Sequence, residues 1–241
     1  MLKGQTAIVT GASRGIGKEI AVKLAQQGMK LTLIGSSEEI HQSAEDLNKM
    51  GFSDVMPIQA DISNEAQVKA AVEKTLQTYG QQLDLLVNNA GMGFFKQVDE
   101  TTLDEWKKVF EVNVQGVFLG SRAVLPHMKE RKSGTIITIS SDVARYTIPN
   151  GSAYTATKYA VQGFSGSLAQ EVREYGIRVG TINPGMVDTF FAESKQGLEE
   201  KKDWLQVEDI ANAVVYMASA PKHMMIDEIV LHPFVQNYPI A

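Results

Sequence analysis

Short apolar runs rich in β-branched residues alternate along the chain with patterns typical of amphipathic helices. The runs lie at residues 6–10, 30–35, 55–59, 83–87, 135–139, 177–182 and 228–231. Strands that are joined by helices rather than by tight turns are typical of a parallel sheet covered on both faces. The alternation therefore predicts a doubly wound α/β fold of about seven strands. No linker-like break interrupts it, so we expect a single domain over residues 1–241.

The first apolar run leads into a glycine-rich turn, Gly11-Ala12-Ser13-Arg14-Gly15-Ile16-Gly17, and then into a helical pattern. Strand, glycine turn and helix form the context expected of a phosphate site in a Rossmann-type fold. Gly11 allows the turn, Gly15 lets backbone approach a pyrophosphate, and Gly17 permits close packing of helix on strand. The turn predicts a dinucleotide site, and a glycine turn without a ligand is the alternative.

The end of the second strand normally decides which dinucleotide is bound. An acidic residue there binds a ribose 2′-hydroxyl, whereas basic groups accept a 2′-phosphate. This chain has Gly35, Ser36 and Ser37 at these positions, with no carboxylate among them to repel a phosphate, and Arg14 is close enough in the chain to reach one. We therefore expect NADP(H) to be preferred, with NAD(H) possible because no second arginine follows the strand.

Polar and small residues follow the later strands, at the sheet edge where ligands of such folds bind. Asp61 follows the third strand, where it is a candidate for binding adenine or for capping the helix expected at 64–79. Asn88-Asn89-Ala90-Gly91 follows the fourth, and the amides are candidates for tying neighbouring strands together. Residues 190–204 mix apolar and charged side chains, which predicts a mobile flap over the substrate.

Three side chains predict an acid/base centre. Tyr154 and Lys158 are four residues apart in the helix expected at 152–175, so they share one face of it. Lowering a phenol pKa from about 10 by about 3 units needs roughly 4 kcal/mol, which one ammonium about 4 Å away supplies at an effective dielectric near 20. Ser141 follows the fifth strand and is placed to hold a carbonyl oxygen. The alternatives are a solvated helix face for the pair and a turn or cap for the serine.

Asn113 separates two helical patterns, at 102–110 and 114–128. Asparagine is a poor helix former, so we expect a local kink at this position. A kink would free a backbone carbonyl to hold a water molecule for proton relay.

Composition excludes several other functions. The chain has no cysteine, which removes disulfides and thiolate chemistry, and the histidines show no metal-ligand spacing, so no metal is expected. A net charge of -5 argues against nucleic-acid binding. Neither a signal peptide nor an apolar run of membrane-spanning length is found, so we expect a soluble, cytoplasmic protein without membrane contacts.

Taken together, these motifs resemble those of the short-chain dehydrogenase/reductase family over nearly the whole chain. The matching segments are TGASRGIG at 10–17, Asp61, NNAG at 88–91, Asn113, Ser141, YxxxK at 154–158 and PG at 184–185. The resemblance implies that Tyr154 is the acid/base, that Ser141 orients the carbonyl, and that Asn113 supports a water relay. It implies that Lys158 binds the nicotinamide ribose and lowers the Tyr154 pKa, and that Thr189 binds the carboxamide. The cofactor-binding residues expected on this basis are Gly11, Ser13, Arg14, Gly15, Ile16, Gly17, Ser36, Asp61, Ile62, Asn89, Ala90, Gly91, Tyr154, Lys158, Pro184, Gly185, Val187 and Thr189.

Within that family the pattern is similar to 3-oxoacyl-[acyl-carrier-protein] reductases and broad carbonyl reductases. Residues 227–233 (DEIVLHP) replace the customary glycine-rich segment of the acyl reductases. Lys129, Arg131, Lys132 and Arg173 are candidates for a basic rim that would bind an acyl carrier protein, and charged helix ends are the alternative. The family pairs helices matching 114–128 and 152–175 between subunits, so small residues at Ala156, Ala160 and Gly163 favour a homodimer or homotetramer.

The sequence thus predicts an NADP(H)-dependent reductase or dehydrogenase that interconverts a small-molecule carbonyl compound and an alcohol, acting on CH-OH groups. A 3-oxoacyl-[acyl-carrier-protein] reductase is the narrower alternative. A dinucleotide-binding regulator without chemistry is the alternative from another class, because a fold alone does not establish activity. The candidates for an apolar substrate pocket are Met92, Phe94, Phe95, Tyr146, Met186, Phe190 and Phe191, with Asp142 as a possible polar contact.

Overall fold

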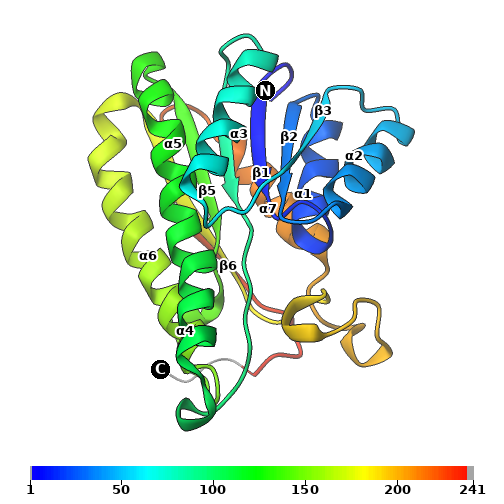
Figure 1. The fold of residues 1–241 in the computed structure, drawn as a ribbon. Helices are drawn as coiled ribbons and strands as arrows, with labels where there is room; N and C mark the ends of the chain where they lie inside the picture. Colours follow the sequence, from blue (N-terminus) through cyan, green and yellow to red (C-terminus); the bar gives the residue numbers. More distant parts are fainter. Residues whose placement is uncertain (1, 238–241) are drawn as a thin grey trace.

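The computed structural model describes residues 2–237 and contains one seven-stranded sheet (Figure 1). The strands are β1 (Thr6–Thr10), β2 (Lys30–Gly35), β3 (Val55–Gln59), β4 (Leu85–Asn88), β5 (Gly134–Ile139), β6 (Ile177–Pro184) and β7 (Glu228–Leu231). Their spatial order is β3-β2-β1-β4-β5-β6-β7, and every neighbouring pair is parallel. The order reverses direction between β1 and β4, which opens a crevice at the carboxyl edge. The predicted Rossmann-type fold and strand number are confirmed.

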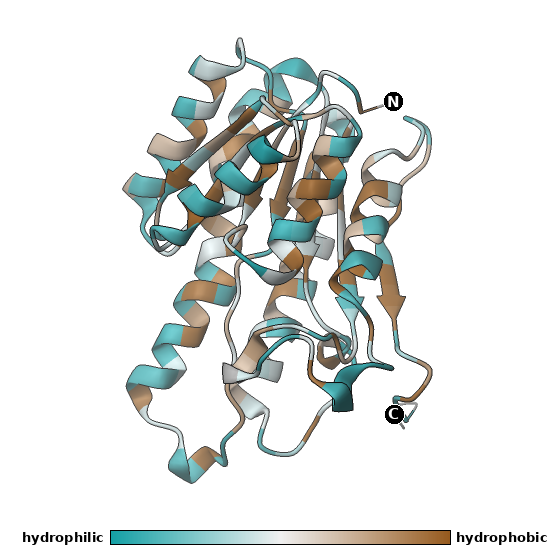
Figure 2. Cartoon of the chain, turned by 90° about the vertical axis from the view of Figure 1, so that its right-hand side faces the viewer, coloured by the Kyte–Doolittle hydropathy of each residue, from teal (hydrophilic) through white to brown (hydrophobic). Residues whose placement is uncertain are grey.

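Helices cover both faces of the sheet. They are α1 (Gly15–Gln26), α2 (Glu39–Lys49), α3 (Glu65–Thr78), α4 (Leu103–Phe110), α5 (Gly116–Arg131), α6 (Ser152–Val172) and α7 (Val207–Ala218). One core cluster holds apolar residues of α1, α2 and α7 against the sheet, and a second holds residues of α3, α5 and α6 on the other face. In Figure 2 the strands carry long brown, apolar stretches, whereas the helices alternate between brown and teal along their length.

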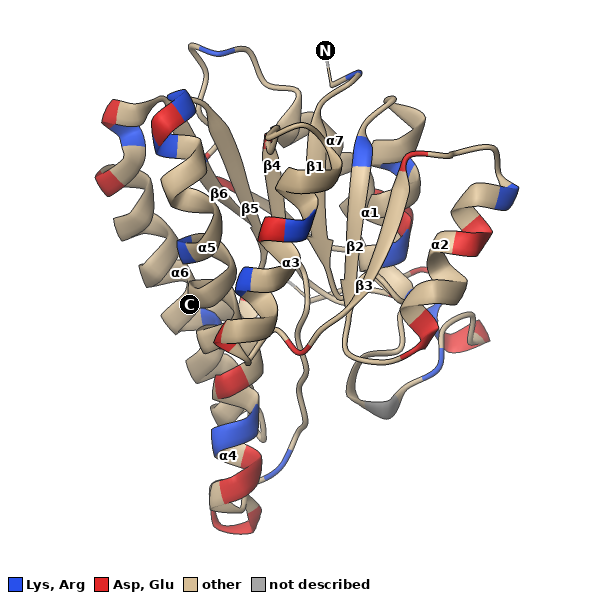
Figure 3. Cartoon of the chain, turned by 45° about the horizontal axis from the view of Figure 1, so that its top comes forward, with Lys and Arg blue, Asp and Glu red and all other residues tan. Residues whose placement is uncertain are grey.

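Strands β1 and β5 are buried along their whole length, because helices pack on both of their faces. Their sequences, TAIVT and GTIITI, are near-continuous apolar or β-branched runs rather than alternating ones, as a doubly covered parallel sheet requires. Charged residues of both signs lie mainly on the helices and loops (Figure 3). Within residues 2–237, none of the helices combines the length and apolar character needed to cross a bilayer.

The predicted kink at Asn113 takes the form of a π-helical turn, Glu111–Gln115, that joins α4 to α5 without a break. Such turns insert a residue into a helix and are frequent at functional sites. The helix that was expected to reach Tyr175 ends at Val172, and a short 3-10 turn, Arg173–Tyr175, follows before Gly176 adopts a left-handed conformation. Of the irregular tail predicted at 233–241, residues 233–237 are irregular and residues 238–241 lie outside the described part.

The 190–204 segment lies beyond the carboxyl edge of the sheet (Figure 1, gold). It contains two 3-10 turns, Phe191–Glu193 and Glu199–Lys201, and an isolated bridge between Val187 and Leu205 closes its base. Inside the segment, Lys201 is buried, lies 3.6 Å from Asp188, and donates hydrogen bonds to the carbonyls of Thr189 and Lys195. The segment is therefore held in place by a buried ion pair.

Candidate active site

A pocket of about 520 Å³ opens at the carboxyl ends of β1 to β4. The residues predicted to bind a dinucleotide that line it are Gly11, Ser13, Arg14, Gly15, Ile16, Gly17, Ser36, Asp61, Ile62, Asn89, Ala90, Gly91 and Thr189. They come from segments far apart in the sequence and meet because parallel strands end at the same edge. The pocket therefore lies at the point where the strand order reverses.

The glycine-rich turn suits a diphosphate. Helix α1 begins at Gly15, and the side chain of its N-cap residue, Arg14, makes no capping hydrogen bond. No acidic residue occupies the first turn, so the positive end of the helix faces the pocket with free N–H groups. Gly11 has a φ of 66°, and a Cβ on Gly17 would lie 2.2 Å from the Gly11 carbonyl oxygen. The close helix-to-strand packing predicted for Gly17 is therefore present.

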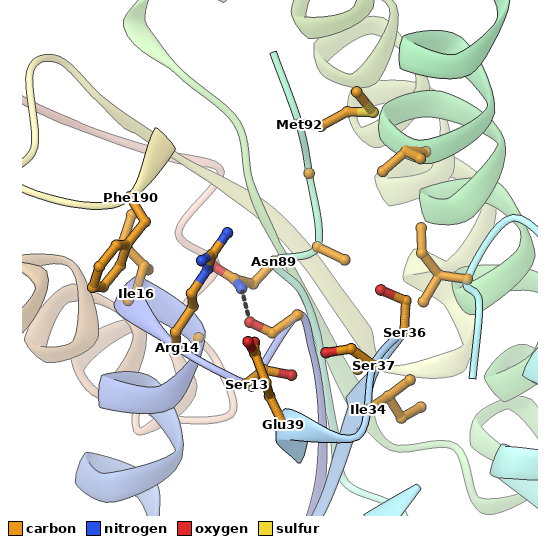
Figure 4. Close-up of a pocket in the computed structure, with 18 of the residues that line it drawn as sticks. Ser13, Arg14, Ile16, Ile34, Ser36, Ser37, Glu39, Asn89, Met92 and Phe190 are labelled. Carbon is orange, nitrogen blue, oxygen red and sulfur yellow. Dashed lines mark hydrogen bonds between the residues drawn. The ribbon is translucent and has the colours of Figure 1, made fainter. Parts of the chain in front are cut away.

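Asn89 ties β4 to the glycine turn. Its side-chain amide donates hydrogen bonds to the carbonyls of Thr10 and Gly11 at 2.9 and 3.1 Å, and Figure 4 draws the bond to Gly11 as a dashed line. The backbone N–H groups of Asn89 and Ala90 both donate to the Thr10 hydroxyl at 3.0 Å. The predicted joining of neighbouring strands by an asparagine amide is confirmed for Asn89, whereas the Asn88 amide donates to the Ser121 hydroxyl on α5.

A carboxylate enters the pocket where the sequence predicted none. Glu39, the first residue of α2, lines the cavity together with Ser36 and Ser37. It lies beyond the three residues that follow β2, so a prediction that considered only residues 35–37 missed it. On the facing side, Arg14 stacks over the ring of Phe190 at 5.1 Å (Figure 4). Arg14 and Glu39 thus add a cation and an anion to a pocket that Lys108 and Asp61 also line.

Asp61 lines the pocket beside the N-terminus of α3. Its Oδ1 accepts hydrogen bonds from the hydroxyl and the backbone N–H of Ser63 at 2.7 and 2.9 Å. These bonds, first of all the one from the Ser63 hydroxyl, lower the pKa of Asp61. The cap of α3 is Asn64, whose side chain accepts from the N–H of Gln67. The capping alternative for Asp61 is therefore wrong, and its other carboxylate oxygen lies at the pocket wall, 4.0 Å from the ammonium group of Lys108.

A second pocket of about 600 Å³ adjoins the first and shares Ile16, Asn89, Gly91, Met92, Thr189 and Phe191 with it. Ser141, Tyr154 and Lys158 line this second pocket, as do Pro184, Gly185 and Val187. The acid/base candidates therefore lie next to the dinucleotide pocket but outside it. A molecule in the second pocket would contact Tyr154 and would lie next to a dinucleotide bound in the first pocket.

Tyr154 is buried, and its surroundings hold the phenol in the neutral form. Burial raises the pKa of Tyr154, the Ser141 hydroxyl counteracts this, and the nearby Asp142 carboxylate adds to the rise. The lowering expected from Lys158 is not seen. Burial is the larger effect because almost no water reaches the hydroxyl, which is consistent with a proton donor in the protein without ligand.

Lys158 is buried beneath Tyr154. Its ammonium group lies 5.5 Å from the centre of the Tyr154 ring and donates to the carbonyl of Ile139 at 3.1 Å. Burial lowers the pKa of Lys158 to about 8. The one-turn spacing did bring the two side chains to the same helix face, but the ammonium group is directed to the end of β5.

Asn113 lies behind the pocket wall rather than in it. Its side chain accepts from the N–H of Met92 at 2.9 Å and donates to the Met92 carbonyl at 2.8 Å and to the Thr157 hydroxyl at 3.1 Å. Asn113 is almost fully buried. It therefore links the π-helical turn, the segment after β4 and the helix of Tyr154. The predicted water on its carbonyl stays a prediction.

Aromatic and aliphatic side chains dominate the second pocket. Phe95 and Phe191 pack against the Tyr154 ring with centroid distances of 6.3 and 5.0 Å. Met92 and Met186 also line it, as predicted, whereas Phe190 lines only the first pocket and neither Phe94 nor Tyr146 lines either one. The sequence reading missed Lys201, Trp204 and Gln236, which come from the 190–204 segment and the C-terminal end. Within residues 2–237, no group of carboxylates and histidines is arranged to hold a metal ion.

Comparison with known proteins gives one consistent result. The family profile described as short chain dehydrogenase matches residues 5–200. An uncharacterized oxidoreductase of Staphylococcus aureus (strain USA300) is 34% identical over 233 residues, which cover 97% of this chain and 99% of that protein. An alcohol dehydrogenase of the archaeon Thermococcus sibiricus, solved with 5-hydroxy-NADP, is 32% identical with a TM-score of 0.91 over 98% of this chain and 99% of that one. A 3-ketoacyl-(acyl-carrier-protein) reductase of Brucella melitensis, solved with NADH, is 29% identical with a TM-score of 0.89 over 97% of this chain and 99% of that one. The chain belongs to the short-chain dehydrogenase family of oxidoreductases.

Proposed function

We propose that the protein is an NADP(H)-dependent oxidoreductase that interconverts a carbonyl compound and a secondary alcohol, with Tyr154 as the acid/base. The observation that carries this proposal is the position of Tyr154. It lies in a mainly apolar pocket, beside Ser141, where that pocket meets the crevice suited to a dinucleotide. A regulator that had lost its chemistry would have no need for this constellation.

Each residue has a defined task in the proposed reaction. A nicotinamide dinucleotide bound in the first pocket would supply or accept the hydride. On substrate binding, the hydroxyl hydrogen of Ser141 turns from Asp142 Oδ1 to the carbonyl oxygen and so orients the substrate. Tyr154, neutral in the protein without ligand, donates its proton to the same oxygen during reduction. Lys158, whose lowered pKa of about 8 leaves it mostly charged at neutral pH, holds the ribose and offsets the phenolate that results.

The preference for NADP(H) follows from Arg14 and from the serines at the end of β2. Arg14 projects into the first pocket and has no carboxylate partner among its described contacts. Ser36 and Ser37 offer hydroxyl donors to a phosphate. Glu39 opposes the preference, since its charge repels a 2′-phosphate. We therefore propose NADP(H) with incomplete discrimination against NAD(H).

The substrate is proposed to be a small carbonyl compound of apolar character. Lys129, Arg131 and Lys132 do not frame the pocket, because α5 runs antiparallel to the strands and ends at the opposite edge of the sheet. Arg131 there forms an ion pair with Asp84, just before β4. The basic rim considered for an acyl carrier protein is therefore at the wrong end of the molecule for delivery of an acyl chain to Tyr154.

We also propose that the protein forms a homodimer or homotetramer through α5 and α6. Phe118 and Tyr159 are 41% and 44% exposed on these helices, and a side chain added at Gly163 would meet open space. Exposed aromatic rings beside small residues are suited to packing against a second copy. Sedimentation of the protein at micromolar concentration tests this, and a monomer would contradict it.

The test of the proposed reaction is a substrate panel run with NADPH and NADH side by side. The panel contains aliphatic and aromatic ketones, aldehydes, the corresponding alcohols and a 3-oxoacyl thioester. We expect oxidation of NADPH with apolar ketones or aldehydes and a higher kcat/KM for NADPH than for NADH. Dinucleotide binding without turnover of any compound would instead favour the regulator.

A further inference from the structure

The C-terminal end of the described chain forms part of the second pocket. Gln236 lines it together with Ser141 and Asp142, although it lies 94 residues from Asp142 in the sequence. Its side-chain amide nitrogen donates to Asp142 Oδ2 at 2.7 Å, and its amide oxygen accepts from the backbone N–H of Met186 at 2.9 Å. Both ends of the amide are used, so its orientation is fixed by the surrounding protein.

The backbone is shaped to admit Gln236. A Cβ on Gly185 would lie 2.1 Å from the Gln236 amide oxygen and 2.9 Å from a ring carbon of His232, so no larger residue fits at that position. The N–H of Gln236 donates to the carbonyl of the buried Pro233 at 3.0 Å, which closes a turn. The turn and the missing side chain at Gly185 together bring Gln236 to Asp142.

Asp142 connects this contact to the acid/base centre. Its carboxylate is buried, and its Oδ1 accepts the hydroxyl hydrogen of Ser141 at 3.1 Å. Its Oδ2 accepts from Gln236 and lies 3.3 Å from Nε2 of His232. A buried carboxylate is expensive unless hydrogen bonds compensate it, so the loss of the Gln236 contact would disturb the whole group.

We propose that Asp142 and Gln236 are a pair of positioning residues for the reaction: Gln236 fixes the Asp142 carboxylate, and that carboxylate holds the Ser141 oxygen in the substrate pocket until the substrate carbonyl takes over the hydroxyl hydrogen. This inference rests on the proposed function. A free serine hydroxyl rotates among staggered positions, whereas one anchored to a fixed carboxylate keeps its oxygen directed to one place. Such preorganisation raises kcat when the anchored group must contact the reacting oxygen.

The pair can be tested by exchanging donor and acceptor. Gln236→Glu keeps an oxygen that accepts from the Met186 N–H, but it places a second carboxylate against that of Asp142. Asp142→Asn places the amide group of the new asparagine against the amide nitrogen of Gln236, so two donors face each other. In the double variant, the amide introduced at position 142 donates to the carboxylate introduced at position 236, while the amide oxygen still accepts from Ser141. Because hydrogen bonds to charged groups are strong, we expect each single variant to lose about 10- to 100-fold in kcat and the double variant to regain most of it.

The matched control is Asn237→Asp, the same amide-to-acid change on the exposed neighbouring residue. It should leave kcat within about twofold of wild type, and all variants should keep the KM for NADPH, because Gln236 and Asp142 do not line the dinucleotide pocket. If Gln236→Glu fails to fold, Gln236→Met replaces it with the same expected loss. A single variant with normal kcat, or a double variant no more active than the worse single one, overturns the proposal.

The wild-type protein is assayed first with the same carbonyl panel. If it reduces none of the compounds, the proposed function fails. If it turns over normally and the exchange shows no recovery, only the positioning role of Asp142 and Gln236 fails.

Discussion

Lys158 lies under the face of the Tyr154 ring, 5.5 Å from its centre, and directs its ammonium group to the carbonyl of Ile139. Both side chains are buried. Because burial disfavours the charged form of each side chain, it raises the pKa of Tyr154 and lowers the pKa of Lys158 to about 8. The protein without ligand therefore stores a proton on the phenol, and any fall in its pKa must come from contacts made on binding.

The buried charge of Lys158 should destabilise the fold in a pH-dependent way. Its folded-state pKa of about 8 is below the ordinary 10.5, so between these values the unfolded chain binds more protons and stability rises with pH. The difference corresponds to about 3 kcal/mol. The free energy of unfolding of wild type relative to Lys158→Met should therefore increase from pH 8 to pH 10 in urea titrations. A difference that is constant with pH would contradict the burial of a charged lysine.

Glu39 should weaken the binding of a 2′-phosphate. At a distance of about 7 Å in water, repulsion between a carboxylate and a doubly charged phosphate is about 1 kcal/mol. Glu39→Gln should therefore lower the KM for NADPH about fivefold and leave the KM for NADH nearly unchanged. Glu38→Gln is the matched control, because Glu38 is exposed and does not line the pocket. Equal effects of the two variants would show that Glu39 does not face the phosphate.

Lys201 should hold the 190–204 segment closed. Its partner Asp188 accepts two bonds from the N–H of Gly197, and removing the lysine leaves that buried carboxylate without its cation. Loss of one partner of a buried pair typically costs about 3 to 5 kcal/mol. Lys201→Met should therefore speed amide hydrogen exchange in residues 190–204 and raise the KM for the carbonyl substrate.

The matched control for this change is Lys202→Met. Lys202 is largely exposed and pairs with Glu199 on the surface, an interaction that contributes little. Its exchange rates should match wild type. Unchanged exchange in Lys201→Met would mean that the segment is held by its apolar contacts instead.

The sequence predicted the strands well, the edge strands β3 and β7 as well as central ones that are buried on both faces. β1, β2, β3 and β7 have the predicted limits, since β-branched runs between glycines and polar residues leave little choice of boundary. The glycine turn and Tyr154-Lys158 were found for a similar reason: their spacing alone brings the groups together. Local sequence patterns thus predicted most of the fold and the main part of the candidate site.

Contacts between distant segments could not be predicted. Gln236 reaches Asp142 across 94 residues, and the pairing of Asp188 with Lys201 depends on the path of an irregular segment. Glu39 faces the pocket only because α2 begins close to the end of β2. The pKa of Tyr154 was predicted with the wrong direction, because spacing indicates that a charge is near but does not indicate how completely water is excluded.

The most direct test of the central claim is the steady-state kinetics of Tyr154→Phe. Phenylalanine keeps the ring that packs against Phe95 and Phe191 and removes only the hydroxyl that would transfer the proton. General acid catalysis typically contributes about 10²- to 10⁴-fold, so kcat should fall by at least that lower value while NADPH binding, measured by fluorescence titration, changes little. Wild-type turnover in this variant would contradict the assignment of Tyr154 as the acid/base.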